Sequence, residues 1–530
     1  LNKKDKILIY FTINIKKKYL MSVLNFFMII KFFLKNCITP FFLIFLFVKC
    51  SNNDLSQKKI NILFILTDDQ RANTINYLGN DDILTPNIDF LAKNGISFLN
   101  TTIMGANNGA VCAPSRAMIM TGRSLYEIDP TGTSIDNDFV TLPRFMNIIG
   151  YDTFHTGKWH NGIESFKNSF SNGKNIFFGG MSDHYKVPLN NFSELGNYSK
   201  DSIYFSERHS ANIYSDTAVE YINNHNSSNP FFMFVSFQTP HDPKQVPDEF
   251  LNIYNKKPID IPTNFKEFHP FDNGELDIRD EWLARFPREK DEVIKHIKAY
   301  YGMITHTDHR IGLIINALKK KGVLDNTLII FTSDNGLAVG QHGLMGKQNL
   351  YDHSIKVPLI MTGPGLDKDK KKYSHIYLND IYPTICKYLR LNIPESVTMS
   401  SFMNLLNSDL DQTQRKHSVH AYKNFQRAIR SDNYKLIKYN VDGVYKNQLF
   451  DITNDPFETN NLVGLSGEMD SIEIKLTSLL QKELIEIGDS VNFNKPSWGV
   501  KKQMGWIKKM EIYSPEGLKN LRELAKKEHL

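Results

Sequence analysis

Two pairs of oxygen-bearing side chains follow apolar runs that are typical of buried strands. Asp68 and Asp69 come directly after ILFILT, and Asp334 and Asn335 come directly after LIIFTS. Three carboxylates that converge on one amide would repel one another unless a cation lay between them. Oxygen ligands favour a hard ion, Ca²⁺ or Mg²⁺, whereas zinc favours clusters of cysteine and histidine that these segments lack. Taken singly, each pair is also an ordinary way to end a strand.

A single cysteine stands at the start of a predicted short helix. In the stretch VCAPSRAMIMTGRSL, Pro114 suits the first turn of a helix and Gly122 suits its end. Cys112 is therefore expected at the amino terminus of this helix, where free N–H groups favour an anionic nucleophile or ligand. Arg116, one turn further on, would lie on the same face and supply a fixed positive charge. The alternative is that Cys112 is a small buried apolar residue, as most lone cysteines are.

Strands and helices alternate from residue 59 onward. Apolar runs such as INILFILT, NPFFMFVSF and NTLIIFTS are separated by segments with helical spacing, among them YYGMITHTDHRIGLIINALKKKG. This order predicts a largely parallel sheet covered by helices on both faces, with ligands at the carboxyl ends of its strands. Further on, RAIRSDNYKLIKYNVDG and YKNQLFDITNDPFETNNL read as short antiparallel strands. The predicted division is a linker at 51–58, a catalytic α/β domain at 59–395, a small α+β domain at 396–485 and a helical extension at 486–530.

The composition is that of a large globular protein. The chain has 530 residues, of which 41% are hydrophobic and 12% aromatic. Its formal net charge is +6, but residues 1–50 hold nine lysines and a single aspartate, so the rest of the chain carries a net charge of −2. The body therefore lacks the basic surface of a nucleic-acid-binding protein, and we expect no nucleic-acid partner.

Residues 1–50 are predicted to direct export. Lysines precede the apolar run ITPFFLIFLFV, and a polar, loop-like stretch follows it. If translation starts at Met28, the segment resembles a bacterial lipoprotein signal with Cys50 as the lipidated residue. The alternative is an uncleaved anchor whose basic end stays in the cytoplasm. Both predict a body in the periplasm or at the cell surface, and the first predicts an outer-membrane lipoprotein that touches the membrane only through its anchor.

Cysteine is rare in the predicted body. Cys37 and Cys50 lie in the targeting segment, which leaves Cys112 and Cys386. Cys386 falls on an apolar helical pattern in DIYPTICKYLRL and is expected in the core. A disulfide between the two remains open, although a body of this size does not need one.

The motifs taken together resemble the type I sulfatases. CAPSR followed by TGR is similar to the family signature, in which the cysteine is converted after translation to Cα-formylglycine. Six further segments are similar to motifs of the family and stand in the family's order along the chain. They are LTDDQ, GKWHNG, QTPHDP, SDNG, GQHGLMGKQNLYDHSIKVPLI and LFDITNDPFETNNL. The resemblance covers residues 59–465. It implies an alkaline phosphatase-like α/β/α sandwich with a mainly parallel central sheet, and a smaller carboxyl-terminal α+β domain with an antiparallel sheet.

The resemblance also implies roles for the matching residues. A calcium ion, or magnesium in its place, would be bound by Asp68, Asp69, Asp334, Asn335 and the modified Cys112. Arg116 and Lys158 would stabilise the nucleophilic oxygen. His160 would hydrogen-bond the second hydroxyl of the aldehyde hydrate. His241 and Lys347 would contact the sulfate ester and assist departure of the alcohol.

The implied chemistry needs an oxygen nucleophile, neutralised sulfate oxygens and a proton for the leaving group. One hydroxyl of the hydrate attacks sulfur in line and displaces the alcohol. The other then loses its proton to His160, and collapse to the aldehyde expels sulfate. An unmodified serine or cysteine would stay sulfated until water attacked.

Three further residues are candidates for substrate contact. Asp183 and His184 lie in the glycine-led polar loop GGMSDHYKVPLNNF, where solvated loop residues are an equally good interpretation. His342, in GQHG, lies near the site in the resemblance. We interpret THTDHR at 305–310 as the surface of a helix near the site and not as a metal-binding triplet.

These observations predict an exported sulfuric ester hydrolase that removes sulfate from a sulfated carbohydrate. A formylglycine-generating enzyme would then be a maturation partner. Two alternatives stay open: a phosphonate or phosphate ester hydrolase with the same modified cysteine, and an inactive glycan-binding protein that retains the fold.

Overall fold

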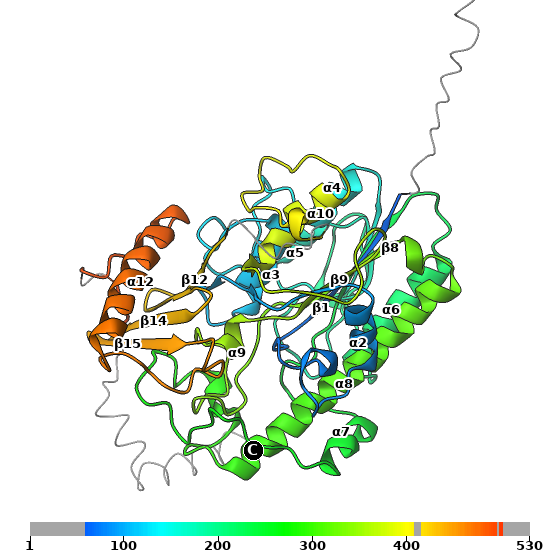
Figure 1. Ribbon diagram of the computed structural model, residues 1–530. Coiled ribbons are helices and arrows are strands. Elements are labelled where there is room, and N and C mark those ends of the chain that lie inside the picture. The colour runs from blue at the N-terminus through cyan, green and yellow to red at the C-terminus, as the bar shows by residue number, and fades with distance from the viewer. Residues whose placement is uncertain (1–58, 407–414, 496–497, 502–530) are drawn as a thin grey trace, which may run out of the picture. The chain divides into compact units, whose positions relative to one another are not determined.

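The computed structural model describes residues 59–406, 415–495 and 498–501 (Figure 1). The predicted targeting segment at 1–50, with Cys50, and the linker at 51–58 lie outside the described residues. Across the part of the chain that is described, none of the helices combines the length and the apolar composition needed to cross a membrane.

A mixed sheet of eight strands forms the centre of the molecule. Its order is β10-β2-β9-β8-β1-β7-β5-β6. Parallel pairing joins β1 to β7 and β8, β5 to β6 and β7, and β2 to β10, whereas β9 runs antiparallel to β8 and β2. The mainly parallel sheet predicted from the sequence is confirmed. The strands are β1 Asn61–Thr67, β2 Ile96–Phe98, β5 Asp152–Lys158, β6 Asn172–Phe177, β7 Phe231–Ser236, β8 Thr327–Ser333, β9 Leu359–Thr362 and β10 Lys370–Lys372.

Helices cover both faces of this sheet, because alternate side chains of its strands point to opposite sides. Phe64 of β1 belongs to the core that includes α3 and α10, whereas Ile65 belongs to the core formed with α2, α6 and α8. The two groups of helices are visible on either side of the strands in Figure 1. Their bounds are α2 Pro86–Lys93, α3 Cys112–Thr121, α4 Leu142–Ile148, α5 Ile163–Lys167, α6 Ser210–Asn224, α7 Asp248–Asn255, α8 Lys290–Lys320, α9 Asp352–Ile355, α10 Ile381–Tyr388 and α11 Met403–Leu406.

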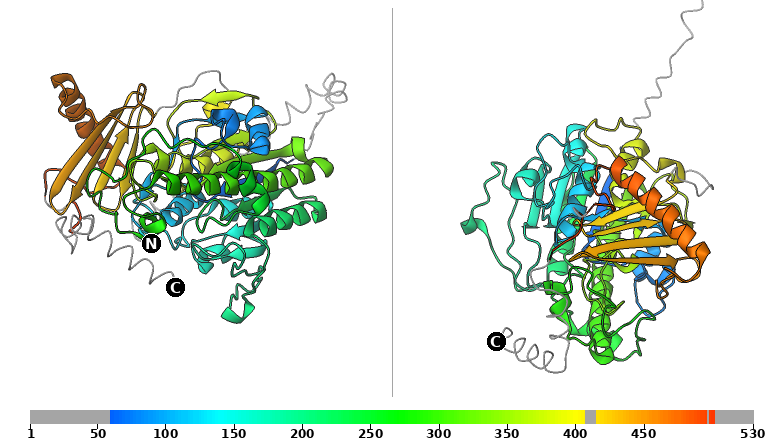
Figure 2. Two further views of the ribbon diagram at one scale, coloured as in Figure 1. Left: turned by 90° about the horizontal axis from the view of Figure 1, so that it is seen from below. Right: turned by 90° about the vertical axis from the view of Figure 1, so that its left-hand side faces the viewer.

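A second sheet, of five strands, lies beside the eight-stranded sheet (Figure 2). Its order is β15-β14-β13-β12-β4, and the four strands from β12 to β15 are antiparallel, as predicted. Leu476, Leu480 and Leu484 of α12 pack on its apolar face. The bounds are β4 Gly105–Ala106, β12 Ser418–Tyr422, β13 Gln426–Arg430, β14 Tyr434–Val441, β15 Val444–Asp451 and α12 Gly467–Glu486.

Short elements complete the described chain. A two-stranded sheet joins β3 (Thr101–Thr102) to β11 (Ile376–Tyr377) in parallel. The 3₁₀ segments are η2 Asn76–Leu78, η3 Lys200–Ser202, η4 Arg279–Leu283, η5 Leu324–Asn326 and η6 Leu378–Asp380.

Two details differ from the sequence-based expectation. The segment 305–310 is not a helix surface: His306 and Asp308 are buried in the middle of α8. The reason is that Asp308 accepts hydrogen bonds from the first N–H groups of α2, while His306 pairs with Asn212 of α6. The described start of the predicted helical extension, residues 487–495 and 498–501, has no helix, because α12 ends just before Gly488, which has a φ of 93°.

Both cysteines of the described body are free and buried. Cys386 lies in the core on α10, as expected, and the disulfide left open by the sequence is not formed.

Candidate active site

The two oxygen-bearing pairs meet at the carboxyl ends of β1 and β8. These strands pair in parallel with Thr67 opposite Ser333, so the residues that follow emerge side by side. The backbone N–H of Asp69 donates to Oδ1 of Asp334 over 3.1 Å, and Nδ2 of Asn335 donates to Oδ1 of Asp69 over 2.6 Å. The register of the sheet thus brings the four side chains together, as the sequence predicts.

The oxygen atoms of this cluster fit a bound cation. Oδ1 of Asp68, Oδ2 of Asp69 and Oδ1 of Asn335 are buried and have no hydrogen-bond partner among the described residues. An unpaired buried oxygen is unfavourable, and one on a carboxylate more so. A donor set of carboxylate and amide oxygens suits a hard divalent ion. Ligand atoms of Asp68, Cys112 and Asp334 also lie within 4.8 Å of one another.

Cys112 is the first residue of α3, as the sequence predicts, and Gly122 ends that helix in the left-handed conformation. The Cys112 side chain is 2% exposed. Its Sγ lies 3.3 Å from Nδ1 of His160 and accepts from Nζ of Lys158 over 3.5 Å. Burial raises the pKa of the thiol, although the positive charges of Lys158 and Lys347 oppose the rise. An unmodified Cys112 is therefore a protonated thiol and a poor nucleophile at neutral pH.

Arg116 links the oxygen-bearing side chains of the candidate cation site to the central sheet. Its Nε donates to Oδ2 of Asp334 over 2.7 Å, and its Nη1 donates to the carbonyl of Lys158 over 2.9 Å and to Oγ of Ser236 over 2.6 Å. Its Nη2 is buried, lies 3.9 Å from Asp68 and has no hydrogen bond among the described residues. One guanidinium N–H group thus remains available for an anion.

Lys158 and His160 come from the end of β5. The Nζ of Lys158 is fully buried and donates to Oδ2 of Asp68 over 2.5 Å. His160 has a φ of 72°, a left-handed backbone conformation that turns the chain after Trp159. Burial holds the pKa of His160 well below its usual value, and the charges of Lys158 and Arg116 lower it further. The imidazole is therefore neutral at physiological pH.

His241 and Lys347 converge on Asp69 from two loops. Nζ of Lys347 donates to Oδ1 of Asp69 over 2.6 Å, and Nε2 of His241 lies 3.6 Å from Oδ2 of the same carboxylate. Nδ1 of His241 lies 2.7 Å from the carbonyl oxygen of Asp242, which fixes the ring. Burial lowers the pKa of Lys347, but the negative groups around it, foremost the carboxylate of Asp69, together outweigh burial and hold the pKa well above its usual value. Lys347 is therefore a permanent ammonium.

The three candidate substrate residues lie in different surroundings. His184 is buried, with Nδ1 2.8 Å from Oγ of Ser210 and Nε2 3.1 Å from the carbonyl of His241, so it supports His241 from behind. Asp183 is exposed, and its carboxylate accepts from the N–H of Tyr185. His342 stacks on Tyr351 with ring centroids 3.9 Å apart. Within the described residues, the contacts of Asp183 and His342 do not include Cys112 or the side chains of the candidate cation site.

Several partners were not predicted from the sequence. Ser115 donates to the carbonyl of Asp334 over 2.5 Å, and Ser236 accepts from Arg116. Ser115 lies inside CAPSR, so the motif itself was the available signal. Arg279 of η4 forms an ion pair with Asp242, the residue after His241. The surrounding sequence LDIRDEWLAR gives no sign of this contact.

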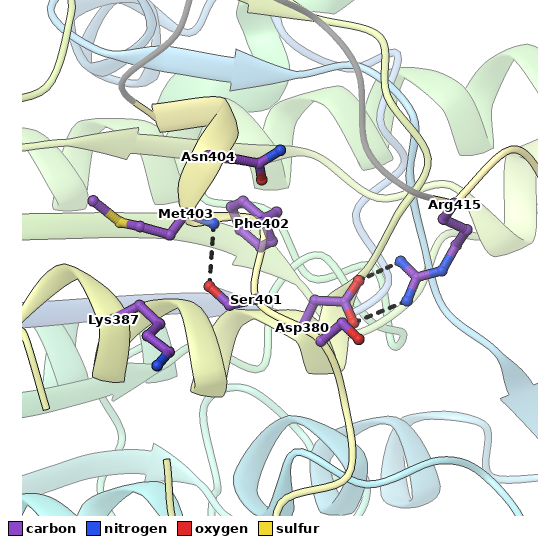
Figure 3. Close-up of a pocket in the computed structure, with 8 residues that line it drawn as sticks. Asp380, Lys387, Ser401, Phe402, Met403, Asn404 and Arg415 are labelled. Atoms are coloured by element: carbon purple, nitrogen blue, oxygen red, sulfur yellow. Dashed lines mark hydrogen bonds and ion pairs between the residues drawn. The ribbon is translucent and has the colours of Figure 1, made fainter. Parts of the chain in front are cut away.

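A cavity of about 730 Å³ lies elsewhere, beside α10 and α11 (Figure 3). Figure 3 shows the ion pair between Arg415 and Asp380 in its wall, with a closest separation of 2.5 Å. None of the site residues above lines it. This cavity is therefore separate from the cluster around Cys112.

Comparison with known protein families shows to which family this chain belongs. The family model described as Sulfatase matches residues 60–391. The chain belongs to the sulfatase family. A second model, described as N-sulphoglucosamine sulphohydrolase, C-terminal, matches residues 340–486 of this sulfatase. The predicted family membership, fold class and hydrolase activity are confirmed.

Relatives and a solved structure match most of this sulfatase. An ulvan-active sulfatase of Formosa agariphila is 27% identical over 454 residues, which cover 81% of this chain and 82% of the relative. An N-acetylglucosamine-6-O-sulfatase of Bacteroides thetaiotaomicron is 25% identical over 510 residues, which cover 82% and 88%. A structure solved with its substrate D-glucosamine-2-N,6-O-disulfate has a TM-score of 0.70 at 23% identity, covering 83% of this chain and all of that one. That last likeness shows the fold.

Proposed function

We propose that this sulfatase removes sulfate from a sulfated carbohydrate by means of a calcium ion and a formylglycine made from Cys112. The observation that carries the proposal is the set of buried oxygens of Asp68, Asp69 and Asn335 that accept no hydrogen bond from any described residue. Such oxygens are stabilised by a hard cation at the position where a nucleophile and a sulfate group would meet. We propose Ca²⁺ as the bound ion, and the alternative is Mg²⁺. The metal-removal experiment below distinguishes the two ions.

The carbohydrate part of the proposal rests on the two relatives, which act on ulvan and on N-acetylglucosamine 6-sulfate according to their names. Export to the periplasm or cell surface, with Cys50 as a lipidated residue, remains a proposal from the sequence of residues 1–50. A formylglycine-generating enzyme is the maturation partner that the conversion of Cys112 requires.

Conversion of Cys112 to formylglycine would replace a thiol that is a poor nucleophile. Burial keeps the thiol protonated, so the unmodified side chain is poorly suited to attack sulfur. A formylglycine hydrate would supply an oxygen nucleophile and a second hydroxyl whose deprotonation releases sulfate. The bound cation would supply neutralising charge for the nucleophile and the sulfate oxygens.

The side chains of the chain divide the remaining tasks. Lys158 and the free Nη2 of Arg116 place positive charge beside position 112 and would stabilise an anionic oxygen there. Neutral His160, 3.3 Å from the Cys112 side chain, would accept the proton of the second hydroxyl. His241 and Lys347, both held by Asp69, would hydrogen-bond the ester and assist departure of the alcohol.

The first test measures sulfate released from nitrophenyl sulfate and sulfated saccharides, together with the mass of the peptide that spans Cys112. We expect release, and a peptide in which one oxygen has replaced the sulfur and two hydrogens. Cys112→Ala should lose the activity. A large preference for nitrophenyl phosphonates would favour the phosphonate hydrolase. Saccharide binding without release, in a protein with the modified peptide, would favour the glycan-binding alternative.

Removal of the cation is the second test. Treatment with a chelator should abolish sulfate release and lower the melting temperature by several degrees, because an ion bound only by the folded state stabilises it. Adding Ca²⁺ back should restore both properties, with Mg²⁺ restoring less. Asp69→Ala should make the melting temperature insensitive to either ion. An untreated protein with no bound divalent ion, and full activity in chelator, would contradict the proposal.

A further inference from the structure

The short 3₁₀ segment η4 contacts several of the loops that form the candidate active site. A 3₁₀ helix has three residues per turn, so three consecutive side chains point in directions about 120° apart. Arg279, Asp280 and Glu281 are the first three residues of η4. Asp280 and Glu281 are buried, whereas the Arg279 side chain is 47% exposed. One turn of η4 can therefore reach three different neighbours.

The Arg279 side chain contacts the loop that carries His241. Both oxygens of Asp242, the residue after His241, accept from the guanidinium, one of them from Nη2 over 3.2 Å. Oδ1 of the same carboxylate lies 3.3 Å from Nδ1 of His241. The other ring nitrogen of His241, Nε2, lies 3.6 Å from Oδ2 of Asp69. Arg279 therefore fixes a carboxylate that lies against the His241 ring.

The Glu281 carboxylate holds the backbone next to Lys347. Its Oε1 accepts from the N–H of Gly346 and its Oε2 accepts from the N–H of Met345, each over 2.9 Å. Arg288 binds the same carboxylate, with Nη2 2.5 Å from Oε2. The side chains of Glu281, Arg288 and Met345 are all buried. Because the two N–H groups belong to the two residues before Lys347, Glu281 fixes the point from which the Lys347 side chain extends into the site.

The Asp280 carboxylate reaches two further segments of the site through Gln348. Nε2 of Gln348 donates to Oδ2 of Asp280 over 2.7 Å and to the carbonyl of Gly109 over 2.9 Å. Oε1 of the same amide accepts from the N–H of Lys347 over 3.0 Å. Gly109 lies three residues before Cys112. Asp280 thus links η4 both to the loop of Lys347 and to the segment that leads into Cys112.

We propose that η4 positions His241 and Lys347 together at the leaving group of the ester. Arg279 acts on His241 through Asp242. Glu281 acts on Lys347 through the backbone, so Arg279 and Glu281 are both positioning residues. The inference rests on the proposed function, in which His241 and Lys347 assist departure of the alcohol. Negative charge grows on the alcohol oxygen as its bond to sulfur breaks, and a donor stabilises it only within about 3 Å.

The test uses the dependence of the rate on the leaving alcohol. Nitrophenol has a low pKa and departs with little assistance, whereas a sugar hydroxyl has a high pKa and needs it. The measurement is kcat/KM of the full, matured chain for nitrophenyl sulfate, phenyl sulfate and the best saccharide substrate. Glu281→Gln should lower kcat/KM roughly 30-fold for the saccharide and less than about three-fold for nitrophenyl sulfate. A merely structural role would lower all three values by the same factor.

Arg279→Lys is a second variant, at a half-exposed position where a loss of folding is not expected. Lysine keeps a positive charge beside Asp242 but lacks the planar fork that binds both of its oxygens. The same pattern should appear with a smaller loss, roughly ten-fold for the saccharide. The matched controls are Arg285→Lys, at a side chain that is 59% exposed, and Glu249→Gln, at an exposed residue of α7. Both controls should leave every rate unchanged.

Double variants show through which residue each change acts. In a Lys347→Ala background, Glu281→Gln should add no further dependence on the leaving alcohol. In a His241→Ala background, Arg279→Lys should likewise add none. Equal losses for all three esters in Glu281→Gln and Arg279→Lys would overturn the inference. So would an effect of Glu281→Gln on this dependence that persists in the absence of Lys347.

Failure of the proposed function has a different result. A wild-type protein that releases no sulfate from any ester, despite a modified Cys112 peptide, contradicts the sulfatase mechanism itself. Hydrogen exchange then still tests the contact of Glu281, because it needs no turnover. The amides of Met345 and Gly346 should exchange about ten-fold faster in Glu281→Gln than in the wild type or in Glu249→Gln. Unchanged exchange of these two amides would overturn the inference.

Discussion

The position of the His160 ring depends on Gly180 having no side chain. A Cβ added to Gly180 would lie 2.5 Å from Nε2 and 2.8 Å from Cε1 of His160. The opposite side of the same ring faces Sγ of Cys112 through Nδ1. The backbone of Gly180 is therefore the wall that keeps the imidazole against position 112. Any methyl group at this position must move the ring or the loop.

We predict that Gly180→Ala lowers kcat for nitrophenyl sulfate by roughly 100-fold with a much smaller change in KM, because a displacement of about 1 Å is enough to misplace the proton acceptor that we propose at His160. The pH–rate profile should also change, since it reports the group that accepts the proton. Gly467→Ala is the matched control, because a methyl group there meets no atom within 4 Å. A Gly180→Ala enzyme with wild-type kcat would contradict this role.

At the scale of elements, the loop from 342 to 352, which carries Lys347, is held at both ends by Phe457 and Glu458 of the segment DPFE. At its start, Nδ2 of Asn264 lies 3.1 Å from Nε2 of His342 and donates to the carbonyl of Phe457 over 2.8 Å. At its end, Oε2 of Glu458 accepts from the N–H of Asp352 over 2.8 Å. Adjacent residues of a distant turn thus hold both ends of the loop that carries Lys347.

A buried ion-pair network strengthens the second point. Nζ of Lys435, fully buried on β14, lies 2.8 Å from Oδ1 of Asp352 and 2.6 Å from Oε1 of Glu458. A buried ammonium that loses one of two carboxylate partners is left partly uncompensated. The network therefore couples the carboxyl-terminal sheet to the loop of Lys347.

We predict that Glu458→Gln lowers the free energy of unfolding by about 1–3 kcal/mol, since it weakens hydrogen bonds to charged groups. It should also lower kcat, because the loop that positions Lys347 loses a support. Urea unfolding and steady-state kinetics measure the two effects. The exposed Glu194→Gln is the control. A stable variant with full activity would show that the turn at 457–458 does not support the loop.

Three buried histidines from different elements form a second feature at this scale. His209, at the start of α6, has ring centroids 5.1 Å from His184 and 4.6 Å from His306 of α8. Burial lowers the pKa of His184 to about 4, that of His209 to about 3 and that of His306 to about 2. The unfolded chain, with a histidine pKa near 6.5, binds protons first as the pH falls. Stability is therefore full above about pH 6.5 and decreases below it.

We predict that His209 alone accounts for a loss of about 2 kcal/mol in unfolding free energy between pH 7.5 and pH 5. His209→Asn tests this, because asparagine keeps an acceptor for the N–H of Ala211 but does not titrate in this range. The decrease measured by urea unfolding should be smaller in the variant by about that amount. An identical decrease in both proteins would contradict the prediction.

At the scale of the whole molecule, the second sheet crosses the domain boundary predicted near residue 395. Its edge strand β4 comes from residues just ahead of Cys112 and pairs in parallel with β12. A Cβ added to Gly105, which has a φ of 106°, would lie 1.9 Å from the carbonyl oxygen of Ala421. One hydrophobic core also includes Leu66 of the large sheet and Ile437 of the small one.

We predict that the described body unfolds in a single calorimetric transition and that a fragment ending at residue 395 does not fold. The fragment would lack the partner of β4 and leave apolar residues of the shared core in water. Circular dichroism and calorimetry on the fragment and the full chain measure this. Two separate transitions, or a folded fragment, would show that the two sheets are independent.

The sequence predicted the parts of this structure that depend on local pattern. Apolar runs followed by Asp68 and Asp334 predict strand ends, and the parallel register that joins them follows from the alternation of strands and helices. Contacts between distant segments were not predictable. Nothing in the two-residue strand β4 distinguishes it from a turn, and periodicity along α8 does not reveal that His306 and Asp308 have neighbours on several sides.

The distance along the chain between β4 and β12 sets an order of events during synthesis. The partner strand of Gly105–Ala106 emerges from the ribosome roughly 300 residues later, an interval of roughly 15–60 s at ordinary elongation rates. Strand β3, which pairs with β11, must wait almost as long. Throughout this interval β4, which ends six residues before Cys112, lacks its partner strand, so the surroundings that bury this thiol are complete only after β12 has been made.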